Sequence, residues 1–263
     1  TAFGVLISLQ AQIMDGGNLS WQVEWLPQLG SSLGFYLDGL SGLFALIVTG
    51  IGTLILIYAG YYFKGDAGAW RFCTYLLLFM TAMTGLVLAG DVLTLFIFWE
   101  GTSVTSFLLV AYKYKYADAR AGAFRALFIT VVGGIALLLG LLIVSYVSGG
   151  TDFATILASG DALRASALYP AMLLLVAAGA FTKSAQFPFH FWLPGAMSAP
   201  TPASAYLHSA TMVKAGIYLL ARMNPALGET EFWFWLLSVV GMITMVTGAF
   251  LGVKNNDLKG LLA

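Results

Sequence analysis

The stretch Gly179-Ala-Phe-Thr-Lys183-Ser-Ala-Gln-Phe-Pro188 places a lysine in an apolar run, 169–187, that is long enough to cross a bilayer as a helix, and a proline directly after this run. Pro188 has no N–H to donate, and its ring clashes with the carbonyl four residues earlier, so we expect the helix to break or kink just after Lys183. Breaks at membrane depth are tolerated where they line a protein or water cavity, and they recur at transport sites. The alternative is an ordinary helix end, in which Pro188 and Pro194 open the following loop.

The composition of the 263 residues identifies the class of protein. Hydrophobic residues make up 60% and charged residues only 9%, whereas charged residues are roughly 25% of an average soluble domain. This excludes a soluble fold and intrinsic disorder, and the balance of 12 Lys+Arg against 12 Asp+Glu leaves no basic face for nucleic acid. The single cysteine, Cys73, excludes an internal disulfide framework, a cysteine-rich zinc site and a four-cysteine iron–sulfur cluster. An integral membrane protein remains.

Seven apolar segments are long enough to span a bilayer as helices, and none shows the short alternating strands of a membrane β-barrel. We therefore expect an all-α fold, a polytopic transmembrane helix bundle that forms a single domain over 1–263. The apolar piece 2–13 and the run that begins at Leu258 are too short to span, so we expect truncated helices at both ends of an internal fragment. The expected spans are 35–63, 72–89, 92–112, 124–147, 169–187, 201–222 and 232–253.

The loop cations orient the bundle in the membrane. Only Arg164 and Arg222 lie on one side, whereas eight lysines and arginines lie on the other, in loops 64–71, 113–125 and 254–260. The positive-inside rule makes the side with eight cations cytoplasmic. We therefore expect a multi-pass protein of the cell membrane, with the loop 15–34 outside.

Three charged residues remain inside the expected spans: Glu100, Lys183 and Lys214. One charge at the bilayer centre costs about 2.5–3.5 kcal/mol on the insertion scale, so three cost on the order of 8–10 kcal/mol. Such groups must face the bundle interior, pair with one another or contact water. They form either a static ion pair that fixes helix packing or a relay for protons and ions. We favour the relay, because a mobile proton can switch one carboxylate near two ammonium groups.

Further polar residues extend this candidate path. His208, Thr211 and Lys214 recur at every third position, which on an α-helix makes a slowly winding polar stripe. His208 titrates near neutral pH, and we expect it to act in the relay rather than only in packing. His190 lies beyond the break, near the membrane interface, and is a secondary candidate. Asp38 stands at a helix start, where N-terminal capping is the first interpretation and transport the second.

No motif for a cofactor or for covalent chemistry occurs in the sequence. There is no Walker loop, dinucleotide-binding glycine pattern, zinc-protease motif or nucleophile elbow. We therefore expect no cofactor, no metal site, no redox centre and no enzyme activity in the chain itself.

Several segments resemble the antiporter-like subunits shared by respiratory complex I and the Mrp multisubunit cation/proton antiporters. The segment that begins Phe98-Trp-Glu100 resembles their glutamate helix, and the segment around Lys183 resembles their broken lysine helix. The segment Phe189-His-Phe-Trp-Leu-Pro-Gly-Ala-Met197 is most similar to the large A subunit of Mrp antiporters. The counterpart in complex I usually has an acidic residue at the position of Gly195. The resemblance covers nearly the whole chain, and the segments that carry it are 98–109, 123–134, 180–197, 200–216 and 256–263. Segment 123–134 is likewise most similar to the large A subunit of Mrp antiporters.

The resemblance implies a larger bundle built from two inverted repeats, each with a broken helix. In that scheme Glu100 is the gate acid of the first half-channel, Lys183 is its partner, and His208 and Lys214 carry the path toward the bundle centre. The second half-channel would lie beyond residue 263. The implied partners are other membrane subunits of a hetero-oligomeric antiporter, with Na⁺ and H⁺ as the transported ions.

Three functions are compatible with these observations. The first is an ion-translocating subunit of a multisubunit Na⁺/proton antiporter, with a proton path through the buried glutamate, lysines and histidine. The second is a proton-pumping membrane subunit of an NADH:quinone oxidoreductase-type complex, in which quinone reduction elsewhere drives the same path. The third is a non-transporting scaffold subunit whose charges only pin helices together.

Overall fold

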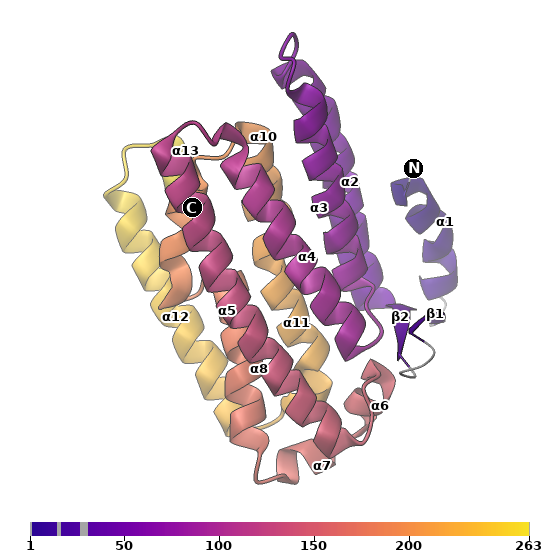
Figure 1. Ribbon diagram of the computed structural model, residues 1–263. Helices are drawn as coiled ribbons and strands as arrows, with labels where there is room; N and C mark the ends of the chain where they lie inside the picture. The colour runs from indigo at the N-terminus through magenta and orange to yellow at the C-terminus, as the bar shows by residue number, and fades with distance from the viewer. Residues whose placement is uncertain (1, 15–16, 27–30, 263) are drawn as a thin grey trace.

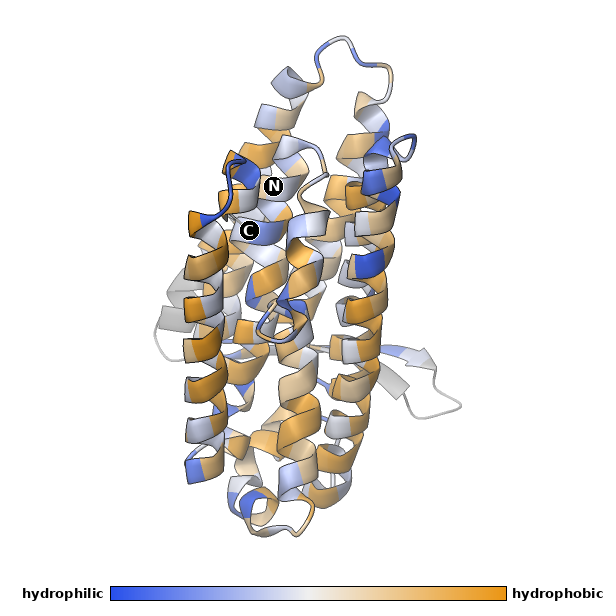
Figure 2. Ribbon diagram, turned by 90° about the vertical axis from the view of Figure 1, so that its left-hand side faces the viewer, coloured by the Kyte–Doolittle hydropathy of each residue, from blue (hydrophilic) through white to orange (hydrophobic). Residues whose placement is uncertain are grey.

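The computed structural model describes residues 2–14, 17–26 and 31–262. Most of this part is helical, and the long helices run side by side between two ends of the molecule (Figure 1). The shafts of the helices are mainly hydrophobic, and hydrophilic residues gather toward the two ends (Figure 2). The expected helix bundle is confirmed, and a small β-hairpin is added to it.

The N-terminal part combines a helix with this hairpin. Its elements are α1, Ala2–Met14, and the antiparallel strands β1, Leu19–Leu26, and β2, Ser31–Leu37. We expected only a loop over 15–34, of which 15–16 and 27–30 lie outside the described residues. The hairpin forms because 19–25, Leu-Ser-Trp-Gln-Val-Glu-Trp, alternates apolar and polar residues with the period of a strand.

Four long helices follow, and consecutive ones pack against each other because the connections between them are short. They are α2, Gly39–Tyr62; α3, Ala69–Val87; α4, Val92–Val110, continued by the short η2, Ala111–Lys113; and α5, Ala117–Ser148. Helix α5 begins well before the expected residue 124, because its charged first turns, with Asp118 and Arg120, extend the helix into the polar region beyond the hydrocarbon core.

The chain then turns at the outer end through two short helices, α6, Phe153–Ala158, and α7, Gly160–Ala165. It returns as α8, Tyr169–Lys183, which packs on α5. Helix α8 ends at Lys183, where the sequence predicts the break. The following segment is divided into η3, Phe189–Trp192; α9, Leu193–Ala196; α10, Thr201–Ser204; the π-helical η4, Ala205–Thr211; and α11, Met212–Leu227.

The last helices are α12, Glu231–Val253, and α13, Leu258–Leu262. Helix α12 lies at the edge of the bundle (Figure 1), and Trp233 is its buried residue. The core of the molecule instead lies among α3, α4, α5, α8 and α11, which contain most of its fully buried side chains.

The described residues contain five segments long and apolar enough to cross a membrane. Two further expected spans are interrupted: 169–187 gives a helix of only 15 residues, and 201–222 changes from π-helical to α-helical at Met212. The five are Gly39–Tyr62, Ala69–Val87, Val92–Lys113, Ala117–Ser148 and Glu231–Val253.

Arg222 corrects the assignment of loop cations. We expected it in an outer loop, but it lies within α11 and is only 5% exposed. Burial is possible because Asp38 pairs with its guanidinium group. The excess of cations on the cytoplasmic side remains without Arg222, so the expected orientation is unchanged.

Candidate ion path

Helix α8 ends in a cap that the sequence pattern does not predict. Two residues after the last helical residue, Ala185 has a left-handed backbone conformation with a φ of 51°. The N–H of Gln186 donates to the carbonyl of Phe181 at 2.9 Å, and the N–H of Ala185 donates to that of Thr182 at 3.4 Å. This is a Schellman motif, which satisfies carbonyl groups and stops a helix inside the molecule. Pro188 thus follows a helix end that is already capped.

The break places Lys183 wholly inside the bundle, with 0% of the residue exposed. Its Nζ donates to the carbonyl oxygen of Trp99 at 2.9 Å and to Oγ of Ser103 at 2.8 Å, both on α4. The ammonium group also lies 5.1 Å from the centre of the Trp99 ring, within the range of a cation–π interaction. Lys183 is therefore held by neutral groups of α4.

Glu100 is the next residue after Trp99, whose carbonyl accepts from Lys183. Its carboxyl group is therefore close enough to interact electrostatically with the Lys183 ammonium. The ion pairs formed by the described residues do not include these two, so the expected partnership is not a direct contact. Oε1 of Glu100 is buried and has no hydrogen-bond partner among these residues. This geometry argues against the static ion pair, because such a pair would join the two groups directly.

Two glycines of α5 make room for these side chains. Gly133 faces Thr182 of α8, and Gly134 faces Oε1 of Glu100. Each approach is so close that a Cβ atom at the glycine would collide with the facing side chain. Helix α5 thus packs closely against α4 and α8 at the level of the candidate path. The sequence pattern does not predict this role for the two glycines.

Trp192 connects the end of α8 with the next polar group. Its indole N–H donates to the carbonyl of Thr182 at 2.9 Å, and its ring centre lies 5.9 Å from that of His208. Both ring nitrogens of His208 are buried without a hydrogen-bond partner in the described part of the chain. Buried polar atoms of this kind are uncommon in folded proteins and call for a specific explanation.

His208 lines a cavity of about 250 Å³ that contains a cation absent from the predicted path. Lys259 lines the same cavity, and its Nζ donates to the carbonyl oxygens of Ala199 at 2.8 Å and Met197 at 3.4 Å. By sequence alone, Lys259 counts among the loop cations. Its place in the apolar run that begins at Leu258 was a signal for partial burial.

The polar stripe of His208, Thr211 and Lys214 differs from the expected one. His208 and Thr211 belong to the π-helical η4, where the Thr211 hydroxyl donates to the carbonyl of Tyr206 at 2.7 Å. A π-helical turn contains more residues than an α-helical one, so the angles expected from α-helical spacing do not apply. Lys214 lies on α11 and donates to the carbonyl of Ser209. No hydrogen bond of the described residues joins Lys214 to His208.

His190 lies beyond the break, as expected, at a cavity of about 350 Å³ that Thr244 of α12 and Lys254 also line. Its ring stacks on Phe187 with ring centres 5.7 Å apart, and its Nδ1 is buried without a partner among the described residues. The cytoplasmic side of the break therefore has a second cavity, in which His190 and Lys254 are ionisable lining residues.

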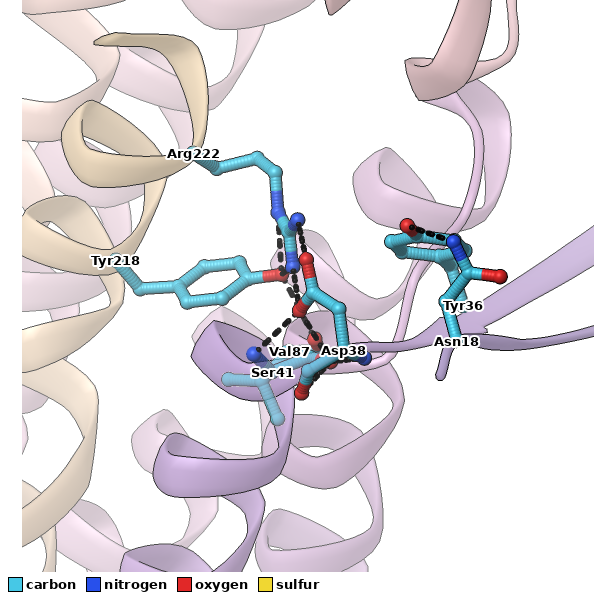
Figure 3. Close-up of polar contacts among 7 residues, drawn as sticks. All are labelled: Asn18, Tyr36, Asp38, Ser41, Val87, Tyr218 and Arg222. Atoms are coloured by element: carbon cyan, nitrogen blue, oxygen red, sulfur yellow. Dashed lines mark hydrogen bonds and ion pairs between the residues drawn. The ribbon is translucent and has the colours of Figure 1, made fainter. Parts of the chain in front are cut away.

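A different charge cluster occupies the outer end of the bundle (Figure 3). Arg222 donates to both carboxylate oxygens of Asp38, at 2.5 and 2.9 Å, and to the hydroxyl of Tyr218 at 3.1 and 3.2 Å. Asp38 also accepts from the N–H of Ser41 at 2.9 Å, so it caps α2 as predicted. The Tyr218 hydroxyl donates to the carbonyl of Val87 at 2.7 Å. The cluster therefore ties α2, α3 and α11 together.

The electrostatics of Asp38 reflect this set of donors. Burial alone would raise the pKa of the carboxyl group, but the hydrogen bonds from Arg222 and Ser41 and the guanidinium charge outweigh it and hold the pKa at about 2. The second interpretation of Asp38, a role in transport, finds no support in a carboxylate so fully engaged.

The groups of the central site suit proton and ion exchange. Glu100, Lys183 and His208 can each bind or release a proton. Within residues 2–14, 17–26 and 31–262, no three His, Cys, Asp or Glu side chains are grouped closely enough to hold a metal ion.

Family comparisons give this arrangement a context. The family described as NADH:quinone oxidoreductase/Mrp antiporter, TM, matches residues 89–263, and the family described as NADH-Ubiquinone oxidoreductase (complex I), chain 5 N-terminus, matches residues 25–73. The chain belongs to the NADH:quinone oxidoreductase/Mrp antiporter family. The expected resemblance is confirmed, and the matched ranges contain all the charged residues of the central site.

Within this family, the chain is similar in sequence to named antiporter subunits. The chain is 48% identical over 261 residues to the A/B subunit of a "Probable K(+)/H(+) antiporter" of Rhizobium meliloti, with 99% of this chain and 26% of the relative covered. It is 47% identical over 249 residues to the A subunit of the Na(+)/H(+) antiporter of Alkalihalophilus pseudofirmus, with 94% and 31% covered. The chain thus spans about a quarter to a third of the length of these relatives.

Solved structures share the fold. The Mrp complex from a Dietzia species contains a chain that superposes with a TM-score of 0.89 at 40% identity, over 99% of this chain and 29% of that one. The archaeal membrane-bound sulfane sulfur reductase, a respiratory membrane complex, gives a TM-score of 0.83 at 22% identity, over 98% of this chain and 42% of that one. The second likeness shows a common fold.

Proposed function

We propose that this chain is part of the large membrane subunit of a multisubunit cation/proton antiporter and carries one half of its proton path, through Glu100, Lys183, His208 and Lys214. The observation that supports this most strongly is the state of the two central groups. The Lys183 ammonium is fully buried and held by neutral acceptors, while Oε1 of the neighbouring Glu100 has no hydrogen-bond partner among the described residues. Ionisable side chains inside a membrane helix bundle are costly and typically mark ion or proton pathways, which fits two such groups that form no ion pair with each other.

Proton movement follows from electrostatics at short range. When Glu100 takes up a proton, the negative charge beside Lys183 disappears, and in a low-dielectric interior this weakens the hold on the ammonium strongly. The lysine can then release its proton in the direction of His208, whose ring lies 5.9 Å from that of Trp192, and Trp192 is bonded to the carbonyl of Thr182 next to Lys183. Lys214 and Lys259 are the next cations, and they respond to the arriving charge.

We propose Na⁺ as the exchanged cation and other membrane subunits as partners. The name of one relative specifies Na⁺ and that of another specifies K⁺, and the Dietzia structure is that of a complex. The transport test therefore compares both cations.

A redox-driven proton pump is the second candidate function. It is favoured by the match of 25–73 to a complex I family and by the fold shared with an archaeal respiratory complex. In that case quinone or sulfur chemistry would take place in other subunits, and this chain would only conduct protons. Cation-dependent proton exchange in vesicles without any redox substrate would favour the antiporter.

The test uses the full-length protein with its partner subunits in everted membrane vesicles, where a fluorescent dye reports the collapse of a pH gradient after Na⁺ or K⁺ is added. Glu100→Gln and Lys183→Ala should each abolish exchange while the complex still assembles. Glu231→Gln, an exposed acid in the first turn of α12, is the matched control and should exchange normally. Full activity of both central variants would overturn the proposal.

The scaffold alternative has its own test. If the charges only pin helices, the double variant Glu100→Lys/Lys183→Glu should keep both assembly and transport. A swapped protein that assembles but does not exchange ions contradicts the scaffold function, because opposite charges are still present at the two positions.

A further inference from the structure

A basic cavity lies on the cytoplasmic side, apart from the candidate path. It has a volume of about 370 Å³ and is formed where the connection between α2 and α3 meets the connection between η2 and α5. Three cations, Arg71, Lys113 and Lys115, line it together with one acid, Asp66. The other lining residues are Gly68, Tyr112, Tyr114 and Tyr116.

The cations of this cavity are not neutralised by the protein. None of the three forms an ion pair with a carboxylate of the described residues, and the acid is engaged in its own turn, where Oδ1 of Asp66 accepts from the N–H of Gly68 at 2.7 Å. The guanidinium group of Arg71 lies 4.9 Å from the centre of the Tyr112 ring. Its Nε is buried and has no hydrogen-bond partner there. The cavity therefore presents donors and positive charge to a ligand.

Hydrogen bonds hold the walls of this cavity in place. The Tyr112 hydroxyl donates to the carbonyl of Gly68 at 2.9 Å and joins the two connections. Arg120 donates to the carbonyl oxygens of Tyr114 at 2.6 Å and Lys115 at 3.2 Å, which fixes the loop that carries the lysines. A site shaped in this way loses less entropy when a ligand binds.

The surroundings of the cavity are those of a membrane interface. Helix α2 ends at Tyr62, α3 begins at Ala69, and both are long enough to span the bilayer. Aromatic side chains near the cavity point outward: Trp70 is 72% exposed and Tyr116 is 67% exposed. Aromatic side chains of this kind sit at the level of lipid headgroups, and basic pockets between membrane helices on the cytoplasmic side suit anionic headgroups.

We propose that this cavity binds the headgroup of an anionic phospholipid of the cytoplasmic leaflet. The phosphate accepts hydrogen bonds from Arg71 and is paired by Lys113 and Lys115, and the acyl chains run down the exposed apolar faces of the neighbouring helices. Exposed apolar side chains are present there, with Leu77 of α3 44% exposed and Phe128 of α5 71% exposed. The ligand chemistry is a phosphate with an attached hydrocarbon anchor, and the interface position favours the lipid over free phosphate.

Lipid binding by the full-length protein in detergent tests the proposal. Phosphatidylglycerol is titrated and the bound lipid is counted by native mass spectrometry, with phosphatidylcholine of the same chain length and inorganic phosphate as separate arms. The double variant Lys113→Gln/Lys115→Gln removes two exposed cations, and Arg71→Gln is made separately. The charge-matched control is Arg125→Gln/Lys254→Gln, which removes two exposed cations on the same side but outside the cavity.

The expected result is preferential binding of phosphatidylglycerol, with affinity reduced about tenfold or more in the double variant and less than about threefold in the control. Equal affinity in wild type and double variant would overturn the site. An equal loss in the control would show that only the general surface charge matters, which also overturns it. Binding of inorganic phosphate as tightly as the lipid would show a free-phosphate site and overturn the lipid assignment.

Discussion

The bundle holds two clusters of buried charge that differ in how fully their polar groups are satisfied. At the outer end, Asp38 and Arg222 form a bidentate ion pair, and Ser41 and Tyr218 form further hydrogen bonds with it. In the centre, Lys183 contacts only neutral acceptors, and Oε1 of the nearby Glu100 is buried without a partner among the described residues.

The difference predicts a structural role for the outer cluster and agrees with the transport role that we propose for the central one. A buried ion pair with complete hydrogen bonding is costly to break, because the remaining partner becomes an uncompensated charge. Lys183 is held by neutral acceptors and makes no direct ion pair with Glu100, so a change in its charge breaks no hydrogen-bonded pair of charges. The outer cluster is therefore expected to determine stability, and the central cluster is expected to determine activity.

The largest effect is expected for Arg222→Met. The variant leaves the Asp38 carboxylate without its cation and should lower the free energy of unfolding by about 3–5 kcal/mol, measured by denaturant titration in micelles. Lys183→Met should lower it by less than about 1 kcal/mol, although it abolishes exchange. An equal loss of stability in both variants would remove the distinction between the clusters.

A substitution in α5 tests whether the central cluster depends on the position of the Glu100 carboxyl group. In Gly134→Ala the new methyl group collides with Oε1 of Glu100, so overpacking should destabilise the protein by about 1–3 kcal/mol and displace the carboxyl group. Exchange activity in vesicles should fall together with stability. Gly241→Ala in the interior of α12 is the control: overpacking is absent because no facing atom of the described residues lies within 4 Å of the new Cβ, so exchange should stay normal and stability should rise by up to about 1 kcal/mol. Normal exchange in Gly134→Ala would show that the position of the Glu100 carboxyl group is not critical.

The ion pair of Asp38 and Arg222 should also make the free energy of unfolding depend on pH under acidic conditions. The pKa of Asp38 falls from 3.8 to about 2 on folding, so its contribution is complete above pH about 4 and disappears as the pH falls to about 2. A shift of this size corresponds to about 2 kcal/mol. Unfolding measured between pH 2 and 6 should show this loss in the wild type and a flatter profile in Asp38→Asn. Identical profiles would mean that the pair does not stabilise the fold.

The smallest effect concerns the helix end beside the central cluster. Ala185 has a positive φ that glycine adopts without strain, so Ala185→Gly should stabilise the protein by up to about 1 kcal/mol. Ala178→Gly, in the interior of α8, should instead destabilise it by about 1 kcal/mol. Thermal unfolding of the two variants separates these effects, and a destabilised Ala185→Gly would contradict the role of the cap.

Sequence reasoning predicts best what depends on local composition. Apolar runs give the helix bundle, and Pro188 marks the region where α8 ends, although the hydrogen bonds of the Schellman motif end it. Hydropathy misplaces Arg222 and Lys259 as loop residues because their burial depends on distant partners. Arg222 pairs with a carboxylate 184 positions away, and Lys259 bonds a carbonyl 60 positions away.

The remaining differences have equally physical causes. The π-helical turn that contains His208 depends on packing between segments, so a periodic pattern cannot reveal it. Hydropathy predicts only a loop over 15–34, whereas the alternation of apolar and polar residues over 19–25 indicates the strand that the structure has. The missing direct contact between Glu100 and Lys183 reflects where α5 places its glycines, and this is a matter of three-dimensional packing.

The short length of α8 has an electrical consequence. Its 15 residues rise about 22 Å, whereas the hydrocarbon core is roughly 30 Å thick, and irregular chain beside a cavity covers the remaining depth. Water in this cavity would concentrate the membrane voltage along the part that α8 occupies, between Lys183 and the outer surface. A charge that moves over this distance gains or loses up to about 2.3 kcal/mol per 100 mV. If Lys183 takes part in the proposed proton path, the break makes its proton step responsive to the transmembrane voltage.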